Sequence, residues 1–343
     1  MDITNNTSLT HLDCHANYLT ALYISNNTNL ISLGCAINSL TSLDLSSNIN
    51  LENLNCSSNP LGNLDISNNT GLTYLLCVLN SLTNLDLSNN PNLIYLDCFK
   101  NSLTSLDISN NANLGRLDCS INSLTNFISS NSPSLTEFNC SSNSLINLDI
   151  LNNTGLTKLD CSRNSLTNLD ISNNTNLIRF VCANNTLTNL DVSNNLSLTE
   201  LYCNNNSLNS LDLANGANNN LLGFNASINP NLTCIKVDDA VYSTTNWTNI
   251  DQQSSFNTNC PGFVGVNETI VSELKLYPNP VQNELFIEVK KGKIEIIDFS
   301  GKIVKTITNP STKSINVFDL YEGIYILKLT TDKGIYINQF IKN

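Results

Sequence analysis

Charged residues are scarce in this chain of 343 residues, since only 13% are Asp, Glu, Lys or Arg, against a usual share of about 25%. Basic residues are the rarest of these, with 6 Lys and Arg against 19 Asp and Glu before residue 261. An acidic body repels phosphate backbones, so nucleic-acid binding is disfavoured. Long apolar runs are also missing, because no uncharged apolar segment approaches the ~18 residues of a membrane span.

Histidine occurs only twice, as His11 and His15. Serine or cysteine nucleophiles normally need a histidine base, and neither a glycine-rich phosphate loop nor a paired-cysteine metal motif is present. His11, Asp13 and His15 alternate along one expected strand, and we interpret them as surface residues rather than as a metal site. The sequence therefore predicts no catalytic residues, no metal, no cofactor and no enzyme activity within this chain.

Cysteine, in contrast, is abundant and strictly periodic. Ten of the 12 cysteines recur at a constant step of 21 residues, and an Asn column and a Leu column keep the same step. A period of this length indicates a solenoid. The cysteines are Cys14, Cys35, Cys56, Cys77, Cys98, Cys119, Cys140, Cys161, Cys182 and Cys203, and the Asn column runs from Asn17 to Asn206.

One repeat reads LIYLDCFKNSLTSLDISNNAN and covers residues 93–113. Its first eleven residues match L-x-x-L-x-L-x-x-N-x-L, with Cys98 in the third Leu position and Asn101 in the Asn position. Its second half, LTSLDIS, predicts another short strand in each coil. The repeat resembles the bacterial leucine-rich repeats of the IRREKO type over about residues 1–213. We therefore expect an all-β fold, a parallel β-solenoid of about ten coils that begins in the middle of a repeat.

Alternation along each strand predicts which side chains fill the solenoid. Leu96 and Cys98 should point inward, while Tyr95, Asp97 and Phe99 point outward. Inward cysteines of adjacent coils have Cβ atoms about 4.8 Å apart, beyond the roughly 3.5–4.5 Å of a disulfide. We therefore interpret the ten periodic cysteines as free thiols that pack as small hydrophobic residues. The Asn column should hydrogen-bond backbone groups at the turn after the first strand.

Cys234 and Cys260 lie outside the period, in a segment at 214–260 that we expect to cap the solenoid. Two interpretations of this pair stay open, a disulfide or two further buried thiols. At the other end, residues 2–7 align with residues 65–70, three periods later, so the chain starts within a coil. This start suggests an N-terminus that is incomplete or misplaced, because an uncapped solenoid end exposes its core.

The composition changes after residue 260, with fewer Asn and Leu and more Ile, Lys and Tyr. We expect a linker at 261–270 and a separate domain at 271–343. Its apolar segments are separated by turn signals such as Lys291-Gly292, which predicts about seven short strands in a small Ig-like antiparallel β-sandwich. The clearest strand segments are Leu285–Val289, Lys293–Asp298, Ile303–Thr308, Gly323–Leu329 and Ile335–Ile341.

Four motifs of this domain resemble the type A C-terminal sorting domain of the type IX secretion system of Bacteroidetes. They are LYPNP with Tyr277, Pro278, Asn279 and Pro280, DFSGK with Gly301 and Lys302, LYEGIYIL with Gly323 and Tyr325, and the ending FIKN. The resemblance implies the type IX machinery as a partner, export to the outer cell surface or the medium, and removal of the domain by a cut near Pro261–Ser272. A stand-alone sandwich that binds a partner is the alternative.

Aspartate recurs at one outward position of the predicted second strand, in members such as Asp44, Asp65, Asp86 and Asp107. Carboxylates repeated about every 4.8 Å repel one another unless they are solvated or neutralised by cations. Weak calcium binding therefore stays open, but no repeat supplies the several converging oxygens of a defined calcium site. A solvated face that resists aggregation is the stronger interpretation.

The face formed by the first strand of each coil differs from this aspartate face. Its outward positions vary from coil to coil, while the inward Leu and Cys positions and the Asn position stay fixed. Aromatic, apolar and basic residues should gather there over three adjacent coils, and such residues anchor interfaces. The candidate patch is Tyr74, Leu76, Val78, Tyr95, Phe99, Lys100 and Arg116. The sequence therefore predicts an exported protein for binding or adhesion to a protein or glycan. The alternatives are a structural spacer, or a regulatory module of a larger enzyme whose N-terminal part is missing.

Overall fold

A computed structural model of the chain describes residues 2–129, 132–260, 276–287, 292–298, 302–308, 314–331 and 334–343. The chain divides into two compact units, Met1–Phe263 and Val264–Asn343. The expected linker at 261–270 and the expected cleavage segment fall outside the described residues. Within the described part, no helix is both long and apolar enough to cross a membrane.

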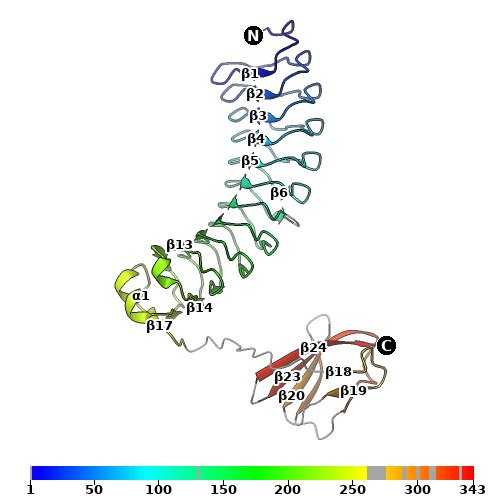
Figure 1. Ribbon diagram of the computed structural model, residues 1–343, viewed down its shortest axis with the longest axis vertical. Coiled ribbons are helices and arrows are strands. Elements are labelled where there is room, and N and C mark those ends of the chain that lie inside the picture. The colour runs from blue at the N-terminus through cyan, green and yellow to red at the C-terminus, as the bar shows by residue number, and fades with distance from the viewer. Residues whose placement is uncertain are drawn as a thin grey trace. The chain divides into compact units, whose positions relative to one another are not determined.

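The first unit is a curved stack of coils built around one long parallel sheet (Figure 1). Each strand pairs in parallel with the strand one coil away, as the register of Tyr74 with Asn53 and with Tyr95 shows. This arrangement confirms the predicted solenoid. The strands of this first face are β1 (His11–Asp13), β2 (Ser32–Gly34), β3 (Asn53–Asn55), β4 (Tyr74–Leu76), β5 (Tyr95–Asp97), β7 (Arg116–Asp118), β9 (Glu137–Asn139), β10 (Lys158–Asp160), β11 (Arg179–Val181), β13 (Glu200–Tyr202) and β15 (Gly223–Asn225).

The solenoid continues one coil beyond residue 213, where the sequence prediction ended it. β15 pairs with β13, and Ala226 occupies the buried position that cysteines hold in the earlier coils. Asn229 occupies the Asn position, because its Nδ2 donates to the carbonyl oxygens of Cys203 and Ala226 at 3.1 and 2.9 Å. Two extra residues separate this coil from the one before, which hid it from a search at a step of 21.

The second strand of each coil is formed in only some of the coils. The described second-face strands make a two-stranded sheet and a four-stranded sheet, and the other coils carry turns and irregular chain there. The inward residues are nevertheless buried throughout, as Leu106 and Ile108 are. The strands of this second face are β6 (Ser105–Asp107) with β8 (Asn126–Ile128), and β12 (Asn189–Asp191), β14 (Ser210–Asp212), β16 (Cys234–Lys236) and β17 (Ser255–Asn257).

The cysteine column lies inside the solenoid, and all ten periodic cysteines are free and buried. Nine of them, from Cys35 to Cys203, are 0% exposed. Burial in this apolar interior raises the pKa of the Cys56 and Cys203 thiols to about 12, because the thiolate would lose its hydration. The thiols therefore pack as neutral apolar groups, as the sequence predicted.

We expect these thiols to be unreactive in the folded protein. An aromatic disulfide reagent at pH 8 should modify none of the ten rapidly in native protein and all of them in denaturant, because the reactive thiolate is both buried and disfavoured. The absorbance of the aromatic thiolate that the reagent releases gives the number of modified cysteines. Rapid modification of several thiols in native protein would contradict the packed column.

Two asparagine columns join neighbouring coils. In the first column, which the sequence predicted, Asn59 Nδ2 donates to the carbonyl oxygens of Cys35 and Cys56 at 3.1 and 3.0 Å, and its Oδ1 accepts from Leu40 N at 3.0 Å. In the second column, Asn90 Nδ2 donates to the carbonyl oxygens of Ile66 and Asn69 at 3.1 and 3.0 Å. Buried backbone carbonyls at both bends are thus satisfied by side chains.

The C-terminal end of the solenoid is closed by a short helix, an aromatic cluster and a disulfide. Helix α1 (Ala240–Asn246) is capped at its N-terminus by Asp239, whose side chain accepts from two backbone amides. Trp247 packs its ring 4.9 Å from Phe224 and 5.6 Å from Phe256, centroid to centroid, and donates from Nε1 to Leu221 O at 3.0 Å. A 3₁₀ turn, η1 (Asn218–Asn220), precedes β15.

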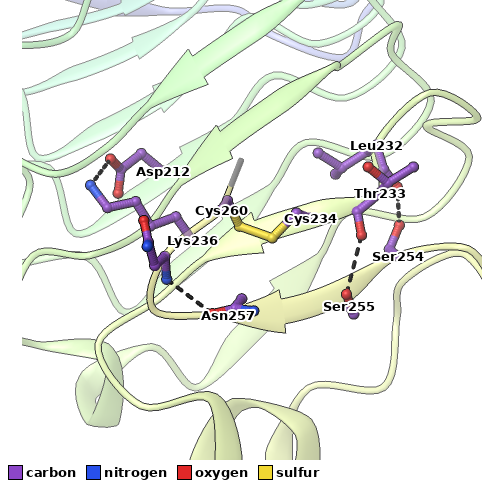
Figure 2. Close-up of a disulfide and its surroundings, with 10 residues drawn as sticks. Asp212, Leu232, Thr233, Cys234, Lys236, Ser254, Ser255, Asn257 and Cys260 are labelled. Carbon is purple, nitrogen blue, oxygen red and sulfur yellow. Dashed lines mark hydrogen bonds and ion pairs between the residues drawn. A yellow bond between two sulfur atoms is a disulfide. The ribbon is translucent and has the colours of Figure 1, made fainter. Parts of the chain in front are cut away.

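Cys234 and Cys260 form a disulfide in this cap (Figure 2). Cys234 opens β16, which pairs in parallel with β17, the last strand of the unit. Lys236 on β16 also pairs with Asp212 on β14, with 2.7 Å between Nζ and Oδ2. The bond therefore fastens the chain that leaves the solenoid to the next-to-last strand of its second face.

The second unit contains two antiparallel sheets that share one core, in agreement with the predicted sandwich. Leu285 and Ile315 from one sheet and Ile296, Leu327 and Phe340 from the other are all buried in it. The first sheet has the order β18 (Leu276–Tyr277), β19 (Glu284–Ile287), β22 (Ser314–Asn316), and the second has the order β21 (Ile303–Thr308), β20 (Lys293–Asp298), β23 (Gly323–Thr331), β24 (Gly334–Lys342).

Candidate functional site

The first face carries a stack of three side chains from adjacent strands. The rings of Tyr74 on β4 and Tyr95 on β5 lie 4.4 Å apart, centroid to centroid, at an angle of 20°. Arg116 on β7 places its Cζ 5.3 Å from the centre of the Tyr95 ring, a cation–π contact. Burial raises the pKa of the Tyr95 hydroxyl, so this ring stays neutral in the stack. Three members of the predicted patch therefore touch.

The other four members of the patch lie beside this stack along the same strands. Leu76 is half-buried and faces Asp97 in the strand register. Val78 and Phe99 follow the strand ends and are half-buried. Lys100 is exposed at a turn with a φ of 55°, so its charge lies at the edge of the face.

Beyond Arg116 the outward side chains form a chain of ion pairs. Glu137 lies between Arg116 and Lys158, with N–O distances of 3.3 and 2.7 Å. The hydrogen bond from Lys158 and the two positive charges lower the pKa of Glu137. In the coil after Lys158, Arg179 pairs with Glu200 at 2.8 Å. This half of the face satisfies its own charges.

On the other side of the stack, the first face is hollowed into a groove of about 590 Å³. Its floor holds small and neutral residues from β2 and β3, and Tyr74 and Leu76 stand at one end. The lining residues are His11, Leu12, Asp13, His15, Ser32, Leu33, Gly34, Asn53, Leu54, Asn55, Tyr74 and Leu76. The sequence prediction missed this groove, although the run of Ser, Gly and Asn in outward positions of two successive coils was its signal.

The two histidines belong to the far end of the groove. His15 Nδ1 lies 2.7 Å from Asp13 Oδ1, and that hydrogen bond lowers the pKa of Asp13. His11 instead contacts Thr10 Oγ1 at 3.0 Å. No group of three or more His, Cys, Asp or Glu side chains suited to a metal ion occurs among the described residues.

The aspartates of the second face close turns. Asp44 Oδ1 accepts from both the hydroxyl and the backbone amide of Ser46, at 2.6 and 3.0 Å, and these hydrogen bonds lower its pKa. Asp65 and Asp86 each accept from the backbone amide of the Ser two positions later. One oxygen of each of these carboxylates is thus used by its own turn.

The motif residues of the second unit hold its strands together. Tyr277 stacks on Phe286 at 5.7 Å between centroids. Asn279 accepts from Ile341 N at 2.8 Å, which ties the LYPNP loop, with its exposed Pro278 and Pro280, to β24. In the DFSGK motif, the amide of Lys302 donates to Asp298. In the LYEGIYIL motif, Gly323 and Tyr325 lie on β23, and the Tyr325 hydroxyl donates to Tyr321 O. Gly301 lies outside the described residues.

A family model described as the secretion system C-terminal sorting domain matches residues 275–343. The match covers the four motifs and both sheets of the second unit. This unit is a type IX secretion sorting domain. The protein is therefore exported by the type IX system to the cell surface or beyond it, and the type IX machinery is its partner during export.

The solenoid is similar to leucine-rich-repeat domains of known structure. The functional domain of InlJ from Listeria monocytogenes, described as including a cysteine ladder, is 28% identical, with 98% of this chain and 91% of that chain covered and a TM-score of 0.55. The leucine-rich-repeat domain of APL1B is 21% identical, with 76% and 86% covered and a TM-score of 0.54. The coils therefore have the fold of a leucine-rich-repeat solenoid, and the sorting domain that follows them supports a secreted protein.

A second family model, Neprosin, matches residues 203–295. This range starts in the last coils and crosses the boundary at residues 263 and 264 into the sorting domain, so it corresponds to no single folded unit. Among curated proteins, none matches the chain. The solenoid and the sorting domain together suggest a binding protein rather than an enzyme.

Proposed function

We propose that the protein binds an extracellular protein or glycan, as an adhesin or receptor, through the first face of its solenoid. The observation that carries the proposal is the stack of Tyr74, Tyr95 and Arg116, with an exposed aromatic residue at its end. Aromatic and arginine side chains dominate binding energy at protein interfaces. A spacer would need no such cluster, and a solvated face would carry charges there instead.

The position of the cluster also supports the proposal. The outward side chains of coils on either side are of two kinds, small and neutral toward the N-terminus and mutually paired ions toward the C-terminus. The core and both asparagine columns do not require this difference, because they lie at other positions of the repeat. Export to the cell surface, together with such a face, supports an adhesive role for a protein attached to that surface.

Replacement of Tyr74, Tyr95 and Phe99 together by Ala should abolish binding. The full chain is first applied to arrays of extracellular proteins and glycans, and the affinity of the strongest saturable hit is measured by titration calorimetry. We expect a loss of at least about 100-fold, because truncation of a hot-spot aromatic residue costs about 2 kcal/mol or more.

The matched control replaces Asn84, Ser105 and Asn126, three exposed residues of the second face, by Ala. This control should keep the affinity of the unaltered chain, and both triple variants should keep the circular dichroism of the solenoid. Unchanged affinity of the aromatic variant would overturn the assignment of the face. Absence of any saturable hit would favour the structural spacer.

A further inference from the structure

Hydrogen-bonding side chains on the first face differ between its two halves. In the C-terminal half they bind one another, as Asn139 does when it donates to Asp118 Oδ2 at 2.9 Å. In the groove, the Ser32 hydroxyl, the side-chain amide of Asn53 and Nδ2 of Asn55 have no hydrogen-bond partner among the described residues, while Oδ1 of Asn55 accepts from Ser57 N. These groups can therefore bind a ligand without first breaking a contact within the protein.

The wall of the groove is the ring of Tyr74. Tyr95 covers this ring on the side of the next coil at 4.4 Å, whereas the register places Asn53 on its other side. Asn53 is too short to cover an aromatic ring, and Tyr74 remains 36% exposed. Tyr95 thus covers one face of the Tyr74 ring, and the opposite face is turned toward the groove.

The floor is open because the outward residues of β2 and β3 are small. Gly34 has no side chain, and a Cβ there would lie 2.9 Å from Asp13 Oδ1. From β1 to β4 the groove crosses three strand spacings, roughly 14 Å in a parallel sheet. A flat apolar wall beside a row of neutral donors and acceptors is the pattern of a site with few, well-placed polar groups.

We propose that this groove is a binding site for a short, neutral oligosaccharide, with a sugar ring stacked on Tyr74 and its hydroxyl groups bound by Ser32, Asn53 and Asn55. A pyranose ring has an apolar C–H face and a rim of hydroxyls that both donate and accept. The Tyr74 face matches the first, and the neutral amides and hydroxyl match the second. This inference rests on the proposed function and names its ligand class.

The charge of the groove disfavours anionic saccharides, and the pairing of its strands disfavours a peptide added as a strand. Asp13 is the only acidic side chain of the lining and no Lys or Arg faces it there, while the first 260 residues hold 19 acidic and 6 basic residues, so an anionic saccharide would be repelled. A peptide cannot add as a strand over the groove floor, because β2 pairs with β1 and β3, and β3 pairs with β2 and β4.

The test uses Asn53→Tyr in the full chain. Tyr74 and Tyr95 show that a tyrosine is accommodated at this repeat position, so the new ring should stack on Tyr74 and occupy the ring face that the sugar would use. The probes are neutral oligosaccharides of glucose, mannose, galactose and N-acetylglucosamine, with a polyuronate as the anionic comparison, titrated by calorimetry. Lys158→Tyr, at the same repeat position five coils away, is the control.

We expect saturable binding of a neutral oligosaccharide to the unaltered chain and to Lys158→Tyr, a loss of at least 30-fold in Asn53→Tyr, and no binding of the polyuronate. Equal affinity in Asn53→Tyr and the unaltered chain would overturn the site, even if sugar binds elsewhere. Binding only of a protein on the arrays, sensitive to the triple aromatic variant, would overturn the saccharide and leave the proposed function standing. Absence of any ligand would overturn both.

Discussion

Asn59→Ala should destabilise the solenoid by about 3 kcal/mol, because a buried donor left without a partner costs about 1–3 kcal/mol and each further hydrogen bond that is lost costs about 1 kcal/mol. The amide of Leu40 loses its acceptor. The carbonyl oxygens of Cys35 and Cys56 each lose one of two donors and keep the Nδ2 of Asn38 and of Asn80, respectively. Asn59 is only 2% exposed, so water cannot replace the amide without opening the bend.

Urea denaturation followed by circular dichroism measures this loss. Asn63→Ala is the matched control, because Asn63 belongs to the same coil and is exposed, and it should change the free energy of unfolding by less than about 0.5 kcal/mol. Asn59→Asp separates hydrogen bonding from packing, since it keeps the size and one acceptor but turns the donor into a second acceptor that faces two carbonyls. It should be at least as destabilising as Asn59→Ala. A stable Asn59→Asp variant would show that packing alone matters at this position.

The sequence was sufficient for the solenoid because one repeat position encodes one physical role. Cysteines at a constant step had to lie in the core, and the asparagines after them had to face the bend, and the structure places both there. The second asparagine column was missed, because the Asn-Asn pairs that contain Asn69 and Asn90 are equally typical of exposed turns. Only the stacking of coils shows that the second member of each pair is buried.

The eleventh coil was missed for a different reason. Its Ala226 is smaller than cysteine and two residues out of step, so neither the residue type nor the spacing marked it. Burial of Ala226 and pairing of β15 with β13 depend on contacts with the coil before it. A repeat that depends on its neighbour can thus lose its own sequence signature at the end of the array.

The candidate site could be predicted only in part. Exposed tyrosines at one repeat position predict a stack, because in-register side chains of parallel strands are about 4.8 Å apart. The groove beside it is defined by what Ser32, Gly34 and Asn53 do not fill. In a single sequence, small residues at such positions look the same as residues under no constraint, and only the three-dimensional structure shows the volume that they leave open.

Removal of the cap disulfide should produce the other large loss of stability, concentrated at one end of the solenoid. The bond closes a loop between residues 26 positions apart, which corresponds to roughly 3–4 kcal/mol in the chain-entropy model. β17 pairs only with β16 among the described residues. Without the bond, β17 and the Trp247 cluster should open before the rest, because coils of a solenoid contact only their neighbours.

Cys234→Ser combined with Cys260→Ser tests this expectation, and mild reduction of the unaltered chain is its natural comparison, since the other ten cysteines are already free. Hydrogen exchange should show lost protection in β16 and β17 and unchanged protection in β2 to β5. Both the double variant and the reduced chain should unfold at lower urea than the oxidised chain. An equal loss of protection in all coils would mean that the cap stabilises the array as one cooperative unit. Unchanged protection everywhere would mean that the aromatic cluster of Phe224, Trp247 and Phe256 closes the end without the covalent bond.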